Sequence, residues 1–501
     1  MRRLDDRKDH WRQAVAFALT VDAVCCLVLV GAWQFSLDDA YQGPLFAACS
    51  LVSIASIGFL AWRYATRLAY HGFVAIQLAF CFWYLLPMLL WSGPTSGVFG
   101  VAVVSSAVHA WKAAVAVYLC KSMVSFLYLV LPFAPTARDH PRQQIQEASN
   151  YRLPMVVIFF QMGLGLIPFF VTGFSFVDAV LAGRSRDGVL RQAQVGSADT
   201  LILLLSYFCV SVVFLALHNA QLRISRSRKV VCIVTAVLGG ALVSLSIATR
   251  SLLIVIGVPL VMVYAMRRRL SPRAIGVIIV SGTLLYLVAD VLVSYRRAGF
   301  DKVFSASRPE MQERTFVDND FFTELVYSMD VIPEYREFSF ESPIYLAATN
   351  LIPRALWPGK PNAENTEFYM RLRTGRVTGD LRGNVLPGII GQYWHVAGWL
   401  GVAAVSLWLA LSAQFAGRIM LRANPSMHYV VLIFVWSAFV SFRAFAVSNF
   451  VAPIIALFTI FLTTRFRMKL RNRRPGFRAV YAGRPAQIPL EKVSALNALH
   501  R

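Results

Sequence analysis

The sequence predicts an all-α protein that crosses a membrane many times, and two observations carry this prediction. Hydrophobic residues make up 57% of the 501 residues and charged residues only 15%, whereas soluble domains carry about 25% charged residues. Apolar runs also recur along the whole chain, and many reach the length of about 20 residues that one membrane-spanning helix needs. Helices in lipid satisfy their own backbone hydrogen bonds, so we expect helices at each of these runs.

About twelve spans account for the apolar runs. Only one stretch, 98–134, is hard to divide, because His109, Lys112 and Lys121 interrupt it, and we count it as a single span with an amphipathic lead-in. The expected spans are 14–33, 44–62, 72–92, 112–134, 153–172, 200–218, 229–248, 251–266, 275–294, 397–417, 428–444 and 447–464.

The basic residues predict the orientation of these spans, because Lys and Arg in short loops gather on the cytoplasmic side. With the N-terminus in the cytoplasm, the basic loops fall inside, and the acidic or uncharged loops 38–43 and 92–97 fall outside. The basic loops lie at 63–67, 135–152, 222–229, 266–273 and 417–422. This agreement predicts a multi-pass protein with both termini in the cytoplasm. It also explains the net charge of +23 without a nucleic-acid partner.

Loop lengths divide the chain into four parts. Residues 1–294 hold the first nine spans with short loops, and 295–396 form a long extracytoplasmic loop. Residues 397–464 hold the last three spans, and 465–501 form a basic cytoplasmic tail that can lean on anionic lipid headgroups. The long loop contains an amphipathic, helix-like stretch at 319–338.

The sequence carries no sign of a cofactor or metal. All seven cysteines lie inside apolar runs, so neither a disulfide framework nor a zinc site can be built from them. We find no glycine motif for a nucleotide and no carboxylate cluster with the spacing of divalent-metal ligands. We therefore expect no cofactor and no metal.

Cationic residues on the expected outer face run against the positive-inside bias. The side chain of a single arginine at a membrane boundary often only extends until its charged group reaches water. Several arginines that come from separate helical hairpins to the same face favour binding of an anion. A guanidinium group can donate two parallel hydrogen bonds to two oxygens of a diphosphate, and it stays positively charged at any relevant pH. The residues expected to bind are Arg250, Arg297, Arg354, Lys360, Arg382 and Arg443.

The long loop 295–396 also holds acid–base groups and aromatic residues. Its possible acid–base carboxylates are Glu324, Asp330, Glu334, Glu364, Glu367 and Asp380. Glu364, Glu367 and His395 are the favoured bases, and an ordinary histidine titrates near neutral pH. Each can equally be a structural residue. Tyr393 can stack on a sugar ring or belong to an interfacial aromatic belt. Asp22 and Asp290 lie inside spans, where a carboxylate is costly. Asp290 lies near the outer end of its span, next to Arg296 and Arg297, which fits either a structural ion pair or a proton-coupled transporter.

The polar segment 350–402 carries a pattern of prolines and glycines. Pro353 is followed by the motif at 357–361 (WPGKP), by Pro387-Gly388, and by a glycine-rich entry into the next helix that contains Gly391, Gln392, Tyr393, Gly398 and Gly401. This pattern resembles the Wzy-type polymerases of oligosaccharide repeat units, which make O-antigen and exopolysaccharide in bacterial inner membranes. The outward Arg250 and Arg443 are similar to arginines of the same family. The family often carries an acidic residue where this chain has Gln392, which shifts the candidate base to His395 or to an upstream carboxylate.

The resemblance implies a fold of the lipid-sugar-using glycosyltransferase kind (GT-C type) in the bacterial inner membrane. Its substrate would be an oligosaccharide on undecaprenyl diphosphate, the arginines would hold the diphosphate, and a chain-length regulator and a flippase would be partners. Three alternatives stay open: an O-antigen-ligase-like glycan transferase, a non-enzymatic polysaccharide transporter or flippase, and a structural partner of a synthase complex.

Overall fold

The chain is an all-α membrane protein. Every regular element among the described residues of the computed structural model is a helix, and five helices are long and apolar enough to cross a membrane: His10–Gln34, Gln42–Tyr64, His71–Leu89, Val108–Val130 and Gly388–Met420. The structure describes residues 2–35, 37, 39–64, 70–91, 107–131, 153–171, 198–222, 224–246, 321–339, 387–422, 429, 431–433, 435, 437 and 448–472.

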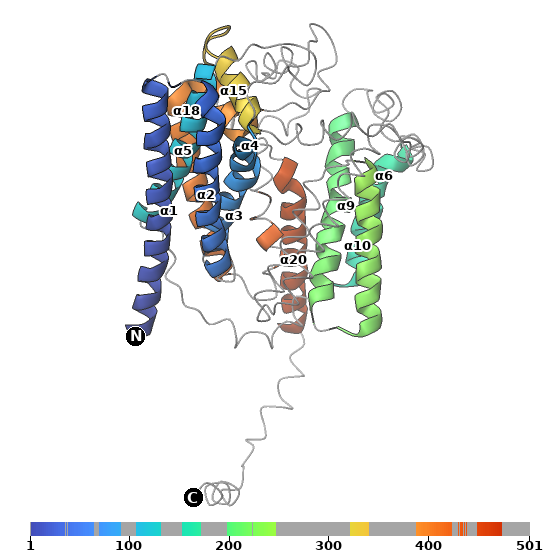
Figure 1. Ribbon diagram of the computed structural model, residues 1–501. Helices are drawn as coiled ribbons and strands as arrows, with labels where there is room; N and C mark the ends of the chain where they lie inside the picture. Colours follow the sequence, from blue (N-terminus) through green and yellow to red (C-terminus); the bar gives the residue numbers. More distant parts are fainter. Residues whose placement is uncertain are drawn as a thin grey trace, which may run out of the picture. The chain divides into compact units, whose positions relative to one another are not determined.

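One group of helices packs around α5 (Ala107–Val130), which contacts α1 (Arg2–Gln34), α15 (Phe321–Val331) and α18 (Gly388–Arg422). The longer helices of this group lie side by side in Figure 1. We call it the α5 group. Its other members are η1 (Asp39–Tyr41), α2 (Gln42–Tyr64), α3 (His71–Phe80), the π-helical turn η3 (Cys81–Leu85) and α4 (Leu86–Leu89).

Aromatic contacts show that successive helices of the α5 group alternate in direction. Trp11, near the start of α1, stacks on Tyr70 just before α3 at 3.9 Å between ring centroids. It also packs edge-on against Tyr64 at the end of α2 and Tyr128 at the end of α5. We call this the Trp11 end. All four rings are buried between the helices.

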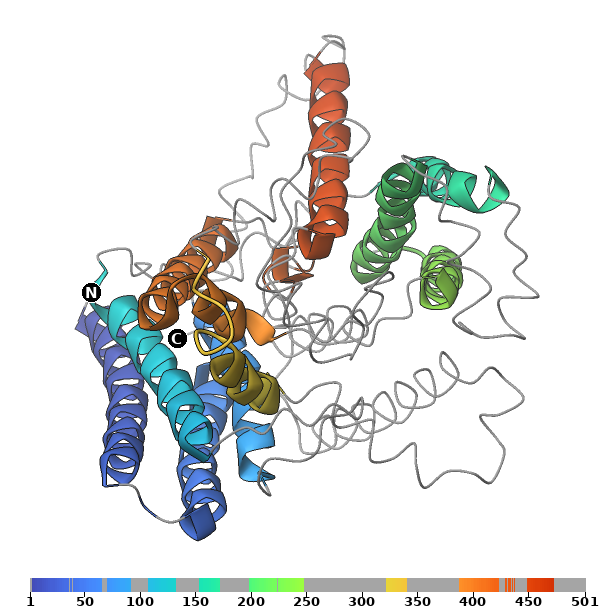
Figure 2. The same cartoon turned by 90° about the horizontal axis from the view of Figure 1, so that it is seen from above.

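At the opposite end of the group, Phe46 near the start of α2 packs against Trp111 of α5 at 5.0 Å and Phe322 of α15 at 5.6 Å between ring centroids. We call this the α15 end, and Figure 2 shows α15 there beside α5 and α18. Lys and Arg are more frequent in the described turns at the Trp11 end than at the α15 end. Arg12, Arg63 and Arg418 lie at the Trp11 end, together with acidic residues in the first turns of α1, whereas Lys112 and Arg336 lie at the α15 end near Asp330 and Glu334. By the positive-inside rule this difference favours a cytoplasmic Trp11 end, and the orientation stays a prediction.

α5 and α18 run in the same direction. Ser406 donates a hydrogen bond to the Cys120 sulfur at 3.2 Å, and eight residues further along both helices Gln414 donates to the Tyr128 carbonyl at 3.1 Å. If both helices span the membrane, the chain between them must cross it an odd number of times. The five spans expected between 153 and 294 satisfy this requirement.

A second group comprises α6 (Met155–Val171), α9 (Ala198–Gln221) and α10 (Arg226–Ser246). The Asn219 amide near the end of α9 exchanges two hydrogen bonds of 3.0 Å with the backbone of Leu153 just before α6, so α6 and α9 are antiparallel. A Cβ on Gly165 of α6 would overlap the Cys209 sulfur of α9, which shows how closely these helices approach.

α20 (Ser448–Asn472) is described by itself, because the division between the two compact units of the chain, 1–457 and 458–501, falls within it. Its apolar part, Val451–Phe466, is shorter than the five long candidates. It corresponds to the expected span 447–464.

The described helices expose large apolar side chains, while some polar and charged side chains are buried within an otherwise apolar interior. Leu27 and Trp62, in the middle of α1 and near the end of α2, are 71% and 80% exposed. Gln77, Asp22 and Lys121 are fully buried. Such a surface requires lipid around it.

Most expected spans coincide with helices, and the differences are local. Helix α5 begins at Ala107 rather than 112, so His109 and Lys112 belong to the helix and not to a separate lead-in. α18 begins at Gly388 rather than 397. The expected spans 251–266 and 275–294 lie outside the described residues, and 428–444 is described only at single helical positions.

A break divides α18 at the expected start of its span. Ala397 and Gly398 leave helical geometry, and Gly398 has φ +55°. A Cβ on Gly398 would lie 2.9 Å from the Phe338 ring, and one on Gly401 would overlap the Tyr393 carbonyl oxygen. Glycine is therefore required at both positions: at Gly398 by backbone conformation and space, and at Gly401 by close approach of the chain.

Candidate functional site

Helix α15 brings part of the expected long loop onto the α5 group. Two consecutive aromatic residues anchor its first turn: Phe321 packs on Trp83 of η3 at 5.1 Å, and Phe322 packs edge-on to Trp91 at 5.2 Å between ring centroids. Ten of its eleven residues are buried. Of the helix-like stretch expected at 319–338, residues 321–331 form a helix, and this helix covers one end of the other members of the α5 group.

The first segment of α18 holds the other side of α15. The Trp394 indole donates a 2.8 Å hydrogen bond to the Ile332 carbonyl oxygen just after α15. The Ser339 amide donates to the His395 carbonyl oxygen at 3.0 Å. A Cβ on Gly391 would lie 3.2 Å from the Ser328 hydroxyl oxygen, so the glycine lets α18 lie against α15.

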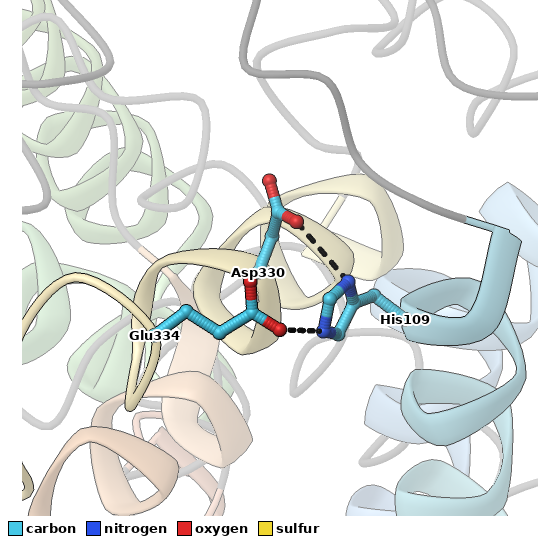
Figure 3. A group of neighbouring side chains, drawn as sticks. All are labelled: His109, Asp330 and Glu334. Carbon is cyan, nitrogen blue, oxygen red and sulfur yellow. Dashed lines mark ion pairs between the residues drawn. The ribbon is translucent and has the colours of Figure 1, made fainter.

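His109, Asp330 and Glu334 form the candidate site at the α15 end (Figure 3). The His109 Nδ1 lies 3.1 Å from an Asp330 carboxylate oxygen, and its Nε2 lies 3.2 Å from a Glu334 carboxylate oxygen. The side chains of His109 and Asp330 are 5% and 7% exposed, whereas that of Glu334 is 53% exposed. The site therefore has a buried side and a side open to its surroundings.

Two helices far apart in the chain create this cluster. His109 lies in the first turn of α5, and Asp330 and Glu334 are four residues apart at the end of α15 and in the turn that follows. The Tyr335 amide donates to the Val331 carbonyl oxygen at 3.0 Å, across a turn that contains the cis Ile332–Pro333 peptide bond. This turn leaves the Glu334 carboxylate beside the same imidazole that Asp330 contacts.

The cluster offers acid–base chemistry and metal-ligand chemistry. A carboxylate held by an imidazole can accept a proton from a nearby hydroxyl. Imidazole nitrogen and carboxylate oxygen are also common ligands of divalent metals, and one such atom from each of the three residues lies within 4.8 Å of the others. Within the part of the chain that the structure describes, this is the one such group of three.

The described part of the chain contains two of the residues expected to form the site, and both are buried in α18. His395 is 1% exposed and Tyr393 is 6% exposed, so neither is open to a sugar ring in this conformation. The other expected residues, Arg250, Arg297, Arg354, Lys360, Glu364, Glu367, Arg382 and Arg443, lie outside the described residues, and their roles stay predictions.

Sequence reasoning named Asp330 and Glu334 among the possible acid–base groups of the long loop, but it treated His109 as an interruption of an apolar run. Nothing in the sequence links position 109 with positions 330 and 334. The only available signal was the cost of an imidazole at the beginning of an apolar helix, which indicates a partner but does not identify it.

Comparison with known proteins gives no relative from which residues could be transferred: neither family models, nor curated proteins, nor solved structures match this chain.

Proposed function

We propose that this protein polymerises oligosaccharide repeat units carried on undecaprenyl diphosphate, by glycosyl transfer at the outer face of the bacterial inner membrane. The product is a surface polysaccharide such as O-antigen or exopolysaccharide. The proposal joins the membrane fold and the resemblance of segment 350–402 with one structural observation, the His109–Asp330–Glu334 cluster at the α15 end.

The cluster supports this function by its place in the fold. A reaction between two lipid-linked sugars needs polar, proton-accepting groups at a membrane interface, where both lipids can present their headgroups. The cluster lies at the end of the α5 group opposite the arginines Arg12, Arg63 and Arg418. With the basic end in the cytoplasm, the α15 end faces outward, where the lipid-linked units are extended.

Glu334 is the base that the described geometry favours. His395, which the sequence favoured together with Glu364 and Glu367, is 1% exposed, and an acceptor hydroxyl must come within hydrogen-bond reach of its base. Glu334 is 53% exposed, and His109 holds one of its oxygens at 3.2 Å. The second oxygen is then oriented for an acceptor, while Asp330 fixes the imidazole from its other side.

The proposed reaction exchanges one bond for another. The acceptor hydroxyl oxygen forms a bond to the anomeric carbon of the donor, and its proton passes to Glu334. The bond from that carbon to the diphosphate breaks, and the electron pair leaves with the lipid diphosphate. The cationic residues of the outer face neutralise the departing charge, which is the main electrostatic contribution to catalysis. They are Arg250, Arg354 and Arg382, assisted by Lys360, Arg297 and Arg443.

The transporter alternative is disfavoured by the environment of Asp22. A carboxylate that carries protons or binds cargo needs access to a polar path. Asp22 and Lys121 are both fully buried and paired with each other, which is the environment of a structural ion pair. A ligase that transfers the finished glycan would use the same donor, so an assay must separate it from a polymerase.

The test uses the full chain in lipid nanodiscs with repeat units on undecaprenyl diphosphate as sole substrate. A polymerase produces a ladder of chain lengths on a gel, whereas a ligase without its acceptor, a flippase or a structural partner produces none. We expect long chains to be lost in Arg250→Ala, Arg354→Ala, Arg382→Ala and Glu334→Gln, with single units accumulating.

Matched variants make the result specific. Glu337→Gln changes an exposed glutamate three residues beyond Glu334, and Arg63→Ala removes an arginine at the Trp11 end; both should leave the ladder unchanged. His395→Ala tests His395 as the base against Glu334, and Glu364→Gln and Glu367→Gln do the same for the other two carboxylates that the sequence favoured. Normal ladders in all three outer arginine variants, with intact protein, would refute the proposed function.

A further inference from the structure

We propose that His109 and Glu334 hold a divalent metal cation at the α15 end, with Asp330 orienting the imidazole. The sequence alone predicts no metal, because the donor atoms come from helices that only the fold brings together. The cation site stands on the described contacts; only its role toward a diphosphate rests on the proposed function.

The His109 imidazole has too few protons for both of its contacts when it is neutral. A neutral imidazole has one N–H, which can donate to one acceptor. Both His109 nitrogens face carboxylate oxygens, at 3.1 and 3.2 Å, and a nitrogen lone pair directed at a carboxylate is repelled. One of the two contacts therefore requires a cation between nitrogen and oxygen, either a second proton or a metal ion.

The distance at Glu334 fits a metal ion. Ligand bonds of about 2.1 Å to nitrogen and oxygen, meeting at an angle of about 100°, separate the two donor atoms by about 3.2 Å. The His109 Nε2 and the Glu334 oxygen are 3.2 Å apart. The cation can therefore enter between them with the side chains where they are.

Asp330 completes the arrangement on the other side of the ring. Histidines that bind metals almost always donate their second N–H to a carboxylate or carbonyl, which fixes the tautomer and the ring orientation. The Asp330 oxygen lies 3.1 Å from Nδ1, and both side chains are at least nine-tenths buried. Nδ1 thus keeps its proton, and Nε2 presents its lone pair toward Glu334.

The chemistry of the donors specifies the class of cation and of ligand. One imidazole and one carboxylate suit Mn²⁺ or Zn²⁺ better than Ca²⁺. Two protein ligands leave several coordination positions open on the exposed side, where Glu334 is 53% accessible. Open positions on a weakly held cation are typical of sites completed by phosphate oxygens of a substrate. We therefore assign a diphosphate as the ligand that completes the site, and the free oxygen of Glu334 remains available as a base.

The experiment measures Mn²⁺ binding to the purified, untagged full chain in nanodiscs of zwitterionic lipid, by loss of the free Mn²⁺ signal in electron paramagnetic resonance. We expect one Mn²⁺ per chain that is released by a chelator and by Zn²⁺. His109→Gln and Glu334→Gln should weaken binding by about tenfold or more, and Asp330→Asn by about 10–100-fold, the usual effect of losing an orienting partner.

Glu337→Gln is the matched control and should bind Mn²⁺ as the wild type does, and each variant must elute as a monodisperse protein. Inorganic diphosphate at millimolar concentration should tighten Mn²⁺ binding in the wild type and not in Glu334→Gln. Absence of binding at millimolar Mn²⁺, or equal loss in Glu334→Gln and Glu337→Gln, would overturn the site and identify the cluster as a protonated ion pair. Specific Mn²⁺ binding in a protein that forms no glycan ladder would keep the site and reject the polymerase.

Discussion

Lys121 of α5 places its ammonium nitrogen 2.5 Å from each carboxylate oxygen of Asp22 in α1, and both side chains are fully buried. Ser53 of α2 joins them, accepting from Lys121 at 2.9 Å and donating to Asp22 at 2.8 Å. Each charged residue lies near the middle of its candidate span. The pair therefore links three helices at a depth where water cannot stabilise either charge.

Replacing Lys121 by Met should destabilise the protein because it leaves the Asp22 carboxylate unpaired. A charge near the centre of a membrane helix costs about 2.5–3.5 kcal/mol on insertion scales, and we expect a loss of that order. Titration of the purified protein with SDS measures the free energy of unfolding. The double variant Asp22→Asn with Lys121→Met removes both charges and should recover most of the loss.

Lys112→Met is the control for this prediction, since Lys112 lies on the same helix near the α15 end and is only partly buried. It should change stability by much less. If the double variant is as unstable as Lys121→Met, the cost comes from lost packing of the lysine stem and not from the unpaired carboxylate.

Gly401→Ala should disrupt the break in α18. A Cβ there would overlap the Tyr393 carbonyl oxygen, and backbone cannot move aside as a flexible side chain can. Overpacking typically costs about 1–3 kcal/mol, visible as a lower melting temperature in detergent. Gly58→Ala in α2 is the matched control, because nothing lies within 4 Å of its Cβ. Helix propensity then favours alanine, so a similar loss in both variants would contradict the explanation.

The sequence was sufficient to predict the described spans because their signal is local. Apolar length and loop charge predicted α1, α2, α9 and α10 to within a few residues, apart from the N-terminal extension of α1 to Arg2. The start of α18 was missed because Gly388 and Gly391 are typical of turns. In the structure Gly388 begins α18 with φ +66° and Gly391 lies in the first turn. The two glycines admit Tyr84, Phe321 and Ser328 at close range, and no local pattern encodes such a tertiary contact.

The candidate site was only partly predictable for the same reason. Asp330 and Glu334 were recognised as acids of the long loop, and the helical character of their segment was expected. Their pairing with His109 depends on how α15 is held beside α5. Phe322 packs against Trp91, just after α4, and the Trp394 indole of α18 donates to the Ile332 carbonyl oxygen just after α15. These contacts join parts of the chain that a single sequence does not relate to one another.

The directions of the helices predict which positions are accessible from each side of the membrane. The variants Glu337→Cys and Arg63→Cys, each made in a chain whose seven native cysteines are replaced, should react oppositely with a membrane-impermeant maleimide. Glu337→Cys should be labelled in cells with a permeabilised outer membrane, and Arg63→Cys only after the inner membrane is opened. Labelling of both cysteine variants from the same side would contradict the alternation of helix directions. If Arg63→Cys were labelled first and Glu337→Cys only after the inner membrane is opened, the protein would have the opposite orientation in the membrane.

Trp394→Phe should weaken cation binding at the site while it changes the stability of the helix bundle only slightly. The substitution keeps an aromatic ring beside Phe338 and Trp399 but removes the hydrogen bond from the indole to the Ile332 carbonyl oxygen at 2.8 Å. One such bond contributes about 1 kcal/mol, so the melting temperature should fall only slightly.

The same substitution should affect the cation site more than it affects stability. Asp330 and Glu334 flank the Ile332 carbonyl in sequence, so their positions relative to His109 should become less fixed when the indole no longer holds it. We expect Mn²⁺ affinity to fall severalfold in Trp394→Phe and to remain at the wild-type value in Trp399→Phe, whose indole is 37% exposed. Equal affinities in the two variants would mean that α15 is held by its apolar contacts alone.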